Sequence, residues 1–184
     1  MRFGTNADAL PDDMDIRILG LLQEDCRTPL ARLGEQVGLS APAVLERIKK
    51  LEAAGIITGY HAIVDGRRLG LDVTAFIGVI TSEPESITSF EQQVTALEDV
   101  LECHHVTGGF TFLLKVKTAN TSTLERLISQ IRAIDGVGRT ETTVVLSTHI
   151  ERVQLGLPPH DTGPPTHTRR TRRSNEGNGH PRRA

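Results

Sequence analysis

Cysteine is scarce in this chain, and long apolar runs and a strong excess of positive charge are absent. The two cysteines among the 184 residues, Cys26 and Cys103, fall in different predicted domains. We therefore expect no disulfide framework, and we expect the protein to reside in a reducing cytoplasm. No apolar run approaches the length that crosses a bilayer. Residues 1–13 lack the apolar stretch of a signal peptide, so we expect a soluble, cytoplasmic protein.

Charge is unevenly distributed along the chain. Residues 1–157 hold 15 Lys or Arg against 21 Asp or Glu, a net charge of −6, whereas residues 158–184 hold six Arg against two acids, a net charge of +4. The bulk electrostatic attraction of the main part of the chain toward nucleic acid is therefore weak. Any binding to DNA would depend on a local basic face and on multivalency.

Residues 30–60 hold the most informative pattern. The apolar face of a first short helix is predicted from residues three to four apart, namely Leu30, Leu33 and Val37. Gly38 follows where helices commonly end in a left-handed residue, and Ser40 stands where the N-cap of the next helix belongs. The buried stripe of that second helix is predicted to consist of Val44, Ile48 and Leu51. This spacing predicts a helix-turn-helix.

In a helix-turn-helix, the outer side of the second helix meets DNA. Its first residues contact base edges, and flanking basic residues contact phosphates. The candidate DNA-contacting residues are Ser40, Ala41, Pro42, Ala43, Glu46, Arg47, Lys49 and Lys50. A helix that faces solvent also commonly carries charged residues on its outer side. The negative charge of Glu46 fits poorly in a row of residues that faces DNA. Spacing alone leaves both interpretations open.

The first sixty residues are predicted to form a three-helix, winged-helix-like DNA-binding domain. Asp12 or Asp13 can cap the first helix. Its apolar face is predicted to contain Ile16, Leu19 and Leu22 or Gln23, with Ile18 and Leu21 beside it. The alternation in residues 56–65 predicts a strand that packs through Ile57, Tyr60 and Ile63. Residues 61–72 are expected to link this domain to the next.

From residue 73 to residue 157 the pattern is that of an α+β domain. Strands are predicted at 73–82, 100–107, 110–117 and 139–148, and helices at 86–97 and 122–136. The order strand, helix, strand, strand, helix, strand is that of a ferredoxin-like βαββαβ fold, in which two helices cover one face of a four-stranded antiparallel sheet. We expect the other face to be buried in a dimer.

Four segments of the chain carry a specific resemblance. They are DMDIRILGLLQED (13–25), GLSAPAVLERIKKLEAAGIITGY (38–60), VLECHHVTGGFTFLLKV (100–116) and RTETTVVL (139–146). Their order and separation resemble the Lrp/AsnC (leucine-responsive and asparagine-responsive regulator) family of bacterial and archaeal transcription factors. The resemblance implies a recognition helix at residues 41–50 that reads pseudo-palindromic double-stranded DNA. It also implies homodimers that assemble up to octamers and a small effector, typically an amino acid, bound in the second domain.

By the same resemblance, the effector-binding residues are Thr107, Gly108, Gly109, Phe110, Thr111, Thr140 and Thr142. The family often has an aspartate where this chain has Thr111, and that acid is available to the ammonium group of the ligand. A neutral hydroxyl makes a hydrogen bond roughly half as strong as a charge-assisted one. Either the effector is not a simple zwitterionic amino acid, or another residue supplies the charge, or ligand sensing has been lost. An ordinary hairpin turn would also account for Gly108-Gly109.

Other patterns give little support for a further site. Cys103, His104 and His105 are metal-ligand residue types, but successive residues of a strand point to opposite faces, so no metal site is predicted. The motifs contain no nucleophile–base pair or paired carboxylates, so neither an enzyme nor a cofactor is predicted. Residues 158–184 are predicted to be disordered. Within them, the basic run 169–173 is either a phosphate-binding segment or part of a solvated extension.

Three hypotheses remain for this protein, which we expect to be associated with the nucleoid. The leading hypothesis is a transcriptional regulator that a small effector modulates. The alternative is a DNA-architectural protein with the same domains and no effector. An enzyme on a ferredoxin-like domain is disfavoured.

Overall fold

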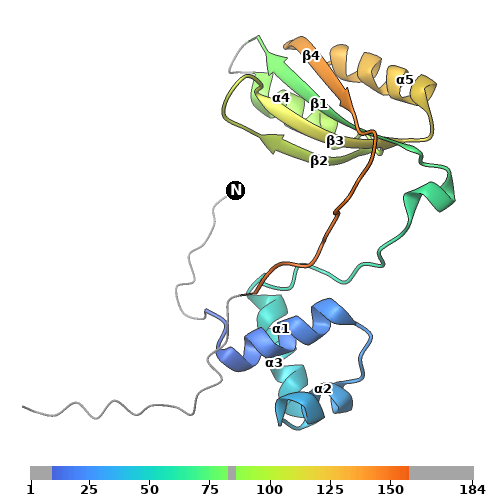
Figure 1. The fold of residues 1–184 in the computed structure, drawn as a ribbon. Helices are drawn as coiled ribbons and strands as arrows, with labels where there is room; N and C mark the ends of the chain where they lie inside the picture. Colours follow the sequence, from blue (N-terminus) through green and yellow to red (C-terminus); the bar gives the residue numbers. More distant parts are fainter. Residues whose placement is uncertain (1–9, 83–85, 158–184) are drawn as a thin grey trace, which may run out of the picture. The chain divides into compact units, whose positions relative to one another are not determined.

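The computed structural model describes residues 10–82 and 86–157, and these residues form two units, each with its own core (Figure 1). One unit contains the described residues up to Tyr60 and those from Gln154 onward, and the other is His61–Val153. Residues 154–157, which the sequence assigned to the second domain, are thus grouped with the N-terminal helices. Gln23 explains this grouping, because its Oε1 accepts a hydrogen bond from the main-chain N–H of Leu155 at 2.7 Å and its Nε2 donates to the Leu155 carbonyl at 3.2 Å. The tail predicted to be disordered, 158–184, lies outside the described residues.

Three helices form the N-terminal unit: α1 (Asp13–Glu24), α2 (Leu30–Val37) and α3 (Ala41–Ala53). Asp12 caps α1, and its side chain and that of Asp15 form a reciprocal capping box. Gly38 has φ 77°, in the left-handed region that only glycine adopts at little cost, and it ends α2. The side chain of Ser40 accepts a hydrogen bond from the N–H of Ala43 and so caps α3. The predicted helix-turn-helix is confirmed.

The core of this unit contains Ile18, Leu33, Val37, Val44 and Ile48. The apolar stripes predicted for α2 and α3 are largely buried, but the face predicted for α1 is only partly right, since Leu22 packs against the core and Ile16 and Leu19 do not belong to it. Ile18 is fully buried, whereas Ile16 and Leu19 are half-buried. Helix α1 carries two adjacent apolar stripes and contacts both α2 and α3. Packing against α2 and α3 determines that the stripe with Ile18 is the buried one. The spacing of residues along α1 contains no information about that packing.

The strand predicted for residues 56–65 is not formed. Ile57 packs against the helical core, but Tyr60 is about half exposed and Ile63 is 81% exposed. The segment leads instead to a short 3-10 helix, η1 (Gly66–Leu69). A strand needs a neighbouring strand for its backbone hydrogen bonds, and in the described part of one chain no strand pairs with this segment.

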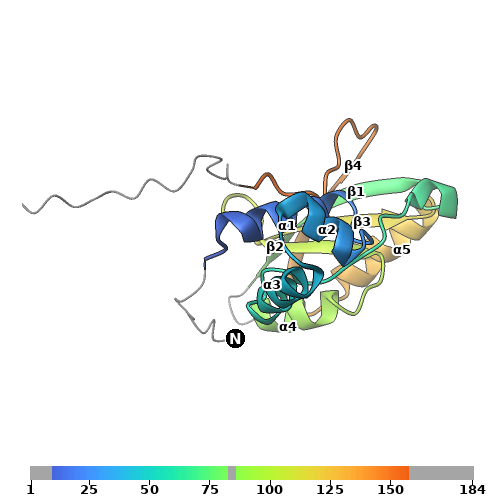
Figure 2. The same cartoon turned by 90° about the horizontal axis from the view of Figure 1, so that it is seen from below.

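The second unit is a four-stranded antiparallel sheet with both helices on one face (Figures 1 and 2). Its elements are β1 (Val73–Thr81), α4 (Ser86–Val94), β2 (Val100–His105), β3 (Phe112–Thr118), α5 (Thr121–Arg132) and β4 (Val137–Val144). The strand order β2-β3-β1-β4 is the ferredoxin-like arrangement that the element order predicted. The predicted α+β fold class is therefore confirmed, with strand ends shifted by a few residues.

Alternate residues of the strands decide which face of the sheet is buried. The core between the sheet and its helices includes Ala75, Ile77, Val79, Phe90, Val94, Phe112, Leu114, Val116, Leu124, Leu127 and Ile131. The rings of Phe90 and Phe112 stack with their centroids 4.7 Å apart. The intervening strand residues, among them Phe76 on β1 and Lys115 on β3, point to the other side of the sheet, which is called the open face below.

Among the described residues, no helix combines the length and the apolar character needed to span a membrane.

Candidate DNA-binding surface and effector site

Helix α3 separates its candidate DNA-contacting residues from its buried stripe. Its inner side is buried through Val44, Ile48 and Leu51. Five of the eight candidate residues are exposed: Ser40, Pro42, Glu46, Lys49 and Lys50. The other three are half-buried: Ala41, Ala43 and Arg47. The first turn of the helix therefore offers small side chains to a partner, and its later turns offer two lysines.

Arg47 lies differently from its neighbours on α3. Its Nη1 donates hydrogen bonds to Asp15 Oδ1 at 2.7 Å and to the two carboxylate oxygens of Asp12 at 2.7 and 2.9 Å. The side chain of Arg47 is 33% exposed, and that of Asp15 is 4% exposed. Spacing along α3 gave no signal of these contacts, because both partners lie more than thirty residues earlier in the chain.

The electrostatic effect of this cluster is visible in two pKa shifts. Burial alone would raise the pKa of Asp12, but the hydrogen bonds from Arg47 and from the main-chain N–H of Asp15 hold that pKa below its ordinary value. Hydrogen bonds to Asp12 and then to Asp15 raise the pKa of Arg47 further above its already high value. Arg47 is therefore a permanent cation that is already paired within the domain.

The predicted effector residues fall into two groups, on the two sides of β1. Val79 shows the separation, because its carbonyl accepts a hydrogen bond from the N–H of Thr111 at 2.8 Å while Thr140 of β4 is its partner in the ladder on the other side. Adjacent strands lie about 4.8 Å apart. The loop 107–111 is thus roughly two strand spacings from Thr140 and Thr142.

Thr111 and Phe110 fasten the loop to β1. Thr111 Oγ1 accepts a hydrogen bond from the N–H of Thr81 at 3.2 Å and lies 3.3 Å from the hydroxyl of Thr81. The ring of Phe110 lies over Gly78, where a Cβ atom would come within 2.6 Å of the ring. Gly108, with φ 117°, and Gly109 remain exposed at the tip of the loop. The hydroxyl that replaces the family aspartate is therefore engaged in holding the loop.

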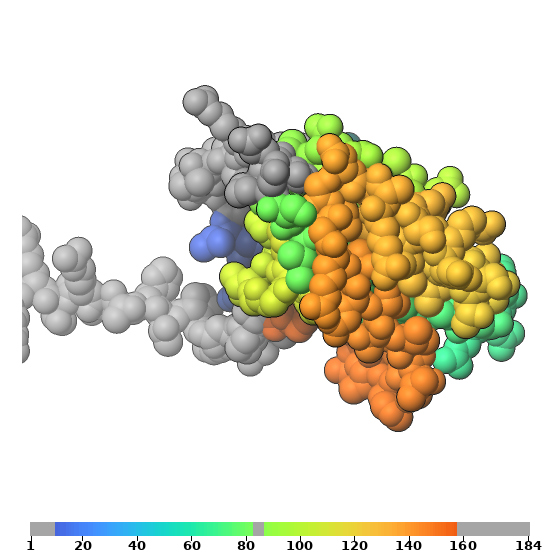
Figure 3. Space-filling view, turned by 90° about the horizontal axis from the view of Figure 1, so that it is seen from above, coloured from blue at the N-terminus to red at the C-terminus, as the bar shows by residue number. Residues whose placement is uncertain are grey.

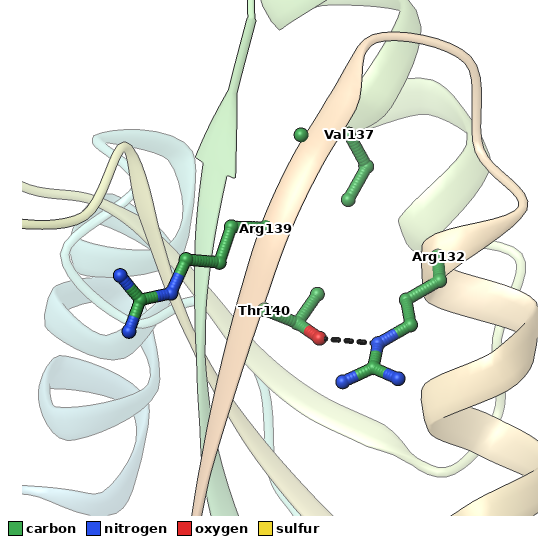
Figure 4. A pocket seen from close by; sticks show the side chains of 5 residues that line it. Arg132, Val137, Arg139 and Thr140 are labelled. Atoms are coloured by element: carbon green, nitrogen blue, oxygen red, sulfur yellow. Dashed lines mark hydrogen bonds between the residues drawn. The ribbon is translucent and has the colours of Figure 1, made fainter.

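An open hollow of about 290 Å³ lies at the end of α5, beside β4 (Figure 4). Its lining consists of Arg132, Val137, Gly138, Arg139 and Thr140. Arg132 Nε donates a hydrogen bond to Thr140 Oγ1 at 2.7 Å. The guanidinium of Arg132 lies beside Thr140, whereas the side chain of Arg139 extends to the other side of β4 (Figure 4).

Arg132 lines this hollow together with the predicted residue Thr140, and nothing in the sequence signalled its position there. In the part of the chain that the structure describes, no carboxylate forms an ion pair with it, so its charge is available to a ligand. Figure 3 shows α5, in gold, and β4, in orange, next to each other at the surface. The pairing of Arg132 with Thr140 depends on how α5 packs against β4, and periodicity does not report that.

The strand geometry of Cys103, His104 and His105 agrees with the predicted alternation. Cys103 and His105 pair with the core residues Leu114 and Phe112, and His104 pairs with Leu113 on the open face. Burial raises the pKa of the Cys103 thiol. Within the described ranges, no group of three or more His, Cys, Asp or Glu side chains is arranged to hold a metal ion.

Comparison with known proteins gives matches to both halves of the chain. The model of the AsnC-type helix-turn-helix domain matches residues 12–52, and that of the Lrp/AsnC ligand binding domain matches residues 74–155. The chain is 41% identical over 136 residues to the uncharacterized HTH-type transcriptional regulator YezC of Bacillus subtilis, covering 74% of this chain and 94% of the relative. It is 35% identical to the regulatory protein AsnC of Escherichia coli K12, covering 78% and 95% of the two chains.

Solved structures give the same picture. The structure of E. coli AsnC matches with a TM-score of 0.75 and 35% identity, over 79% of this chain and 99% of that one. A feast or famine regulatory protein of Mycobacterium tuberculosis, complexed with L-methionine, matches with a TM-score of 0.75 and 31% identity, over 80% and 99%.

Proposed function

Since this chain belongs to the Lrp/AsnC family of transcriptional regulators, we propose that it binds a pseudo-palindromic operator as a homodimer, with α3 of each protomer in the major groove. The observation that carries this proposal is the exposed outer side of α3 above a buried inner stripe. A two-fold symmetric dimer presents two such helices to half-sites about 34 Å apart. Two local basic surfaces then act together, which compensates for the net negative charge of the chain, −2.

Base readout is assigned to the first turn of α3 and phosphate binding to its later turns. Ser40, Pro42 and Ala43, with Ala41 behind them, lie where a recognition helix meets base edges. Lys49 and Lys50 are exposed, and among the described residues neither forms an ion pair, so both are available to phosphates. Glu46 is exposed on the same side and would rather oppose than support DNA binding.

A salt-dependence measurement tests the DNA surface. We expect the protein to bind a duplex from the region upstream of its own gene more tightly than a random-sequence duplex. Lys50→Ala should weaken binding to both duplexes and reduce the slope of log K against log salt by about 1.8, because each phosphate contact contributes about 0.9 and a dimer has two. Glu46→Ala should not weaken binding. Equal affinity of the wild-type protein for both duplexes would contradict the regulator function.

The effector is proposed to be a small carboxylic acid that the protein recognises without an ammonium contact. An amino acid such as the L-methionine bound by the mycobacterial relative offers both a carboxylate and an ammonium group. In this chain Thr111 carries no charge and its hydroxyl is bonded to Thr81. Arg132 supplies a cation beside Thr140, and Thr142 lies on the same side of β4. The residues therefore favour the carboxylate half of the ligand over its ammonium half.

Matched ligand pairs test this effector class. In a thermal-shift panel of L-amino acids and their corresponding 2-oxo acids, an oxo acid should stabilise the protein at least as well as its amino acid. Arg132→Gln should abolish the shift, and Arg126→Gln, which removes an exposed arginine of the same helix, should leave it intact. A wild-type preference for the amino acid would refute the assignment.

The dimer is proposed to form through the open face of the sheet. Phe76 is 37% exposed there, and Ile80 and Leu113 are half-buried in a single chain. A second copy would bury these apolar groups, which the helices on the other face cannot reach. Further assembly of dimers, up to an octamer, is proposed on the family pattern, together with a location at the nucleoid, where the DNA is.

The alternative is an effector-independent DNA-architectural protein with the same domains. The engagement of the Thr111 hydroxyl with Thr81 is the observation that favours it. In the thermal-shift panel, absence of stabilisation by every ligand would favour this alternative. Equal affinity for upstream and random DNA would add to that support.

A further inference from the structure

Arg47 lies on the recognition helix but does not belong to its DNA-binding side. We propose that Arg47 is a positioning residue, which clamps the middle of α3 to the N-terminal turn of α1 through Asp12 and Asp15 and makes no contact with DNA. It acts on DNA binding only by fixing the orientation of α3 within the domain.

The geometry ties two helices together at one nitrogen atom. Nη1 of Arg47 lies 2.7 Å from Asp15 Oδ1, and 2.9 and 2.7 Å from Oδ1 and Oδ2 of Asp12. Arg47 is in the centre of α3, and the two carboxylates belong to the N-cap and the third residue of α1. A cation that bridges both acids resists rotation and sliding of α3 against the end of α1.

The two carboxylates are also held in place by hydrogen bonds that do not involve Arg47. Asp12 Oδ1 accepts the N–H of Asp15 at 2.8 Å, and Asp15 Oδ2 accepts the N–H of Asp12 at 3.2 Å. This capping box orients one oxygen of Asp15 toward α3. The acceptor site is therefore rigid, and a long arginine side chain loses less freedom per hydrogen bond when its partners are already in place.

Because the Asp15 carboxylate is buried, loss of its ion pair with Arg47 would be energetically costly. The side chain of Asp15 is only 4% exposed, and within the described residues Arg47 is its one cationic partner. If Arg47 turned outward to a phosphate, a carboxylate nearly without solvent would lose its counter-charge, and an uncompensated buried charge is strongly destabilising. A phosphate contact does not require the loss of this ion pair, because Lys49 and Lys50 on the same helix are exposed and form no ion pair with any residue that the structure describes.

Salt-dependent DNA binding separates a clamp from a phosphate contact. The full chain and the variants Arg47→Gln, Asp15→Asn and the double variant are titrated with a random-sequence duplex and with the upstream duplex, at several salt concentrations. Thermal melting is measured on each. Lys50→Gln is the matched control for a cation lost from the same helix. The random duplex counts phosphate contacts whatever the operator is, so failure of the proposed operator binding leaves this readout intact.

The clamp predicts that Arg47→Gln weakens binding with an unchanged salt slope and lowers the melting temperature by on the order of 10 °C. Asp15→Asn, which keeps the arginine, should weaken binding too, and the double variant should be no worse than the poorer single variant. Lys50→Gln should lower the slope by about 1.8 without a change in melting.

Two results would overturn the proposal. One is a salt slope that falls in Arg47→Gln as it does in Lys50→Gln. The other is an Asp15→Asn variant that binds DNA as well as the wild type or better, since releasing Arg47 would then help a phosphate contact. If Arg47→Gln does not fold, the affinity of Asp15→Asn alone decides between the two roles.

Discussion

Tyr60, the only tyrosine of the chain, reports on a single hydrogen bond at the end of the N-terminal unit. Its hydroxyl donates to Glu52 Oε1, on the last turns of α3, at 2.9 Å. Burial and then the hydrogen bond and negative charge of Glu52 raise the pKa of Tyr60 to about 12. The neutral phenol is the form that the folded protein stabilises, so this contribution to stability is present below the ordinary pKa of tyrosine and is lost as the pH rises through the shifted value.

A spectroscopic titration checks this assignment without interference, because the chain has no tryptophan. Phenolate absorbance of the wild type should rise with a midpoint at a pH of about 12. In Glu52→Gln the midpoint should move down toward the ordinary tyrosine value of about 10, and in the control Glu46→Gln it should not. Equal midpoints in Glu52→Gln and the wild type would show that Glu52 does not raise the pKa.

At the scale of elements, the contact between α1 and α3 depends on charge as well as on apolar packing. Ile18 fills the space between the helices, and the cluster of Arg47 with Asp12 and Asp15 closes one end of it. The pKa of Asp12 is lower in the folded protein than in the unfolded chain. A depressed carboxyl pKa adds stability above the unfolded pKa of about 3.9, and that stability disappears as the pH falls through the folded value.

The free energy of unfolding of the N-terminal unit should therefore decrease in acid. Tyr60 fluorescence during urea unfolding should give a constant free energy of unfolding near neutral pH and a decline once the pH drops below about 4. Asp12→Asn should be less stable at neutral pH and should decline less in acid. Glu151→Gln is the control, because Glu151 and its partner Lys115 both lie in the second unit. A decline of the same size in Asp12→Asn and the wild type would rule out Asp12 as its source.

At the scale of the whole molecule, the chain passes between its two units twice, since residues from Gln154 onward return to the helical unit. The helices cover one face of the sheet, and the open face keeps Phe76 as its exposed aromatic residue. In a single chain these features leave an apolar surface in water. The proposed homodimer would bury that surface and would supply the paired recognition helices that a pseudo-palindromic operator requires.

A charge placed on the open face should separate the protomers. Phe76→Glu should sediment as a monomer at concentrations at which the wild type is a dimer or larger, because burying an unpaired carboxylate opposes association. Its far-UV circular dichroism should match that of the wild type, since Phe76 is not in the core. The control Gln130→Glu adds the same charge to an exposed position on α5. An unchanged sedimentation coefficient for Phe76→Glu would exclude the open face as the dimer interface.

The sequence alone determined the five α-helices and the four sheet strands of the described residues in their order, whereas the strand predicted for residues 56–65 is not formed. Ser40 as a cap, Gly38 as a left-handed stop and the βαββαβ succession were all predictable, because caps, turns and periodicity depend on residues a few positions apart. The family segments then identified the kind of protein. These signals are local, and the folded chain keeps them.

Only the tertiary structure decided what these elements do to one another. It selected Ile18 rather than Ile16 for the core, paired Arg47 with acids of α1, joined Arg132 to Thr140 and brought Leu155 back to Gln23. All of these contacts join different segments of the chain, and the pairs Arg47–Asp15 and Leu155–Gln23 join residues more than thirty positions apart. Their existence depends on how helices and strands pack in three dimensions, a property that the spacing of residues along one element does not contain.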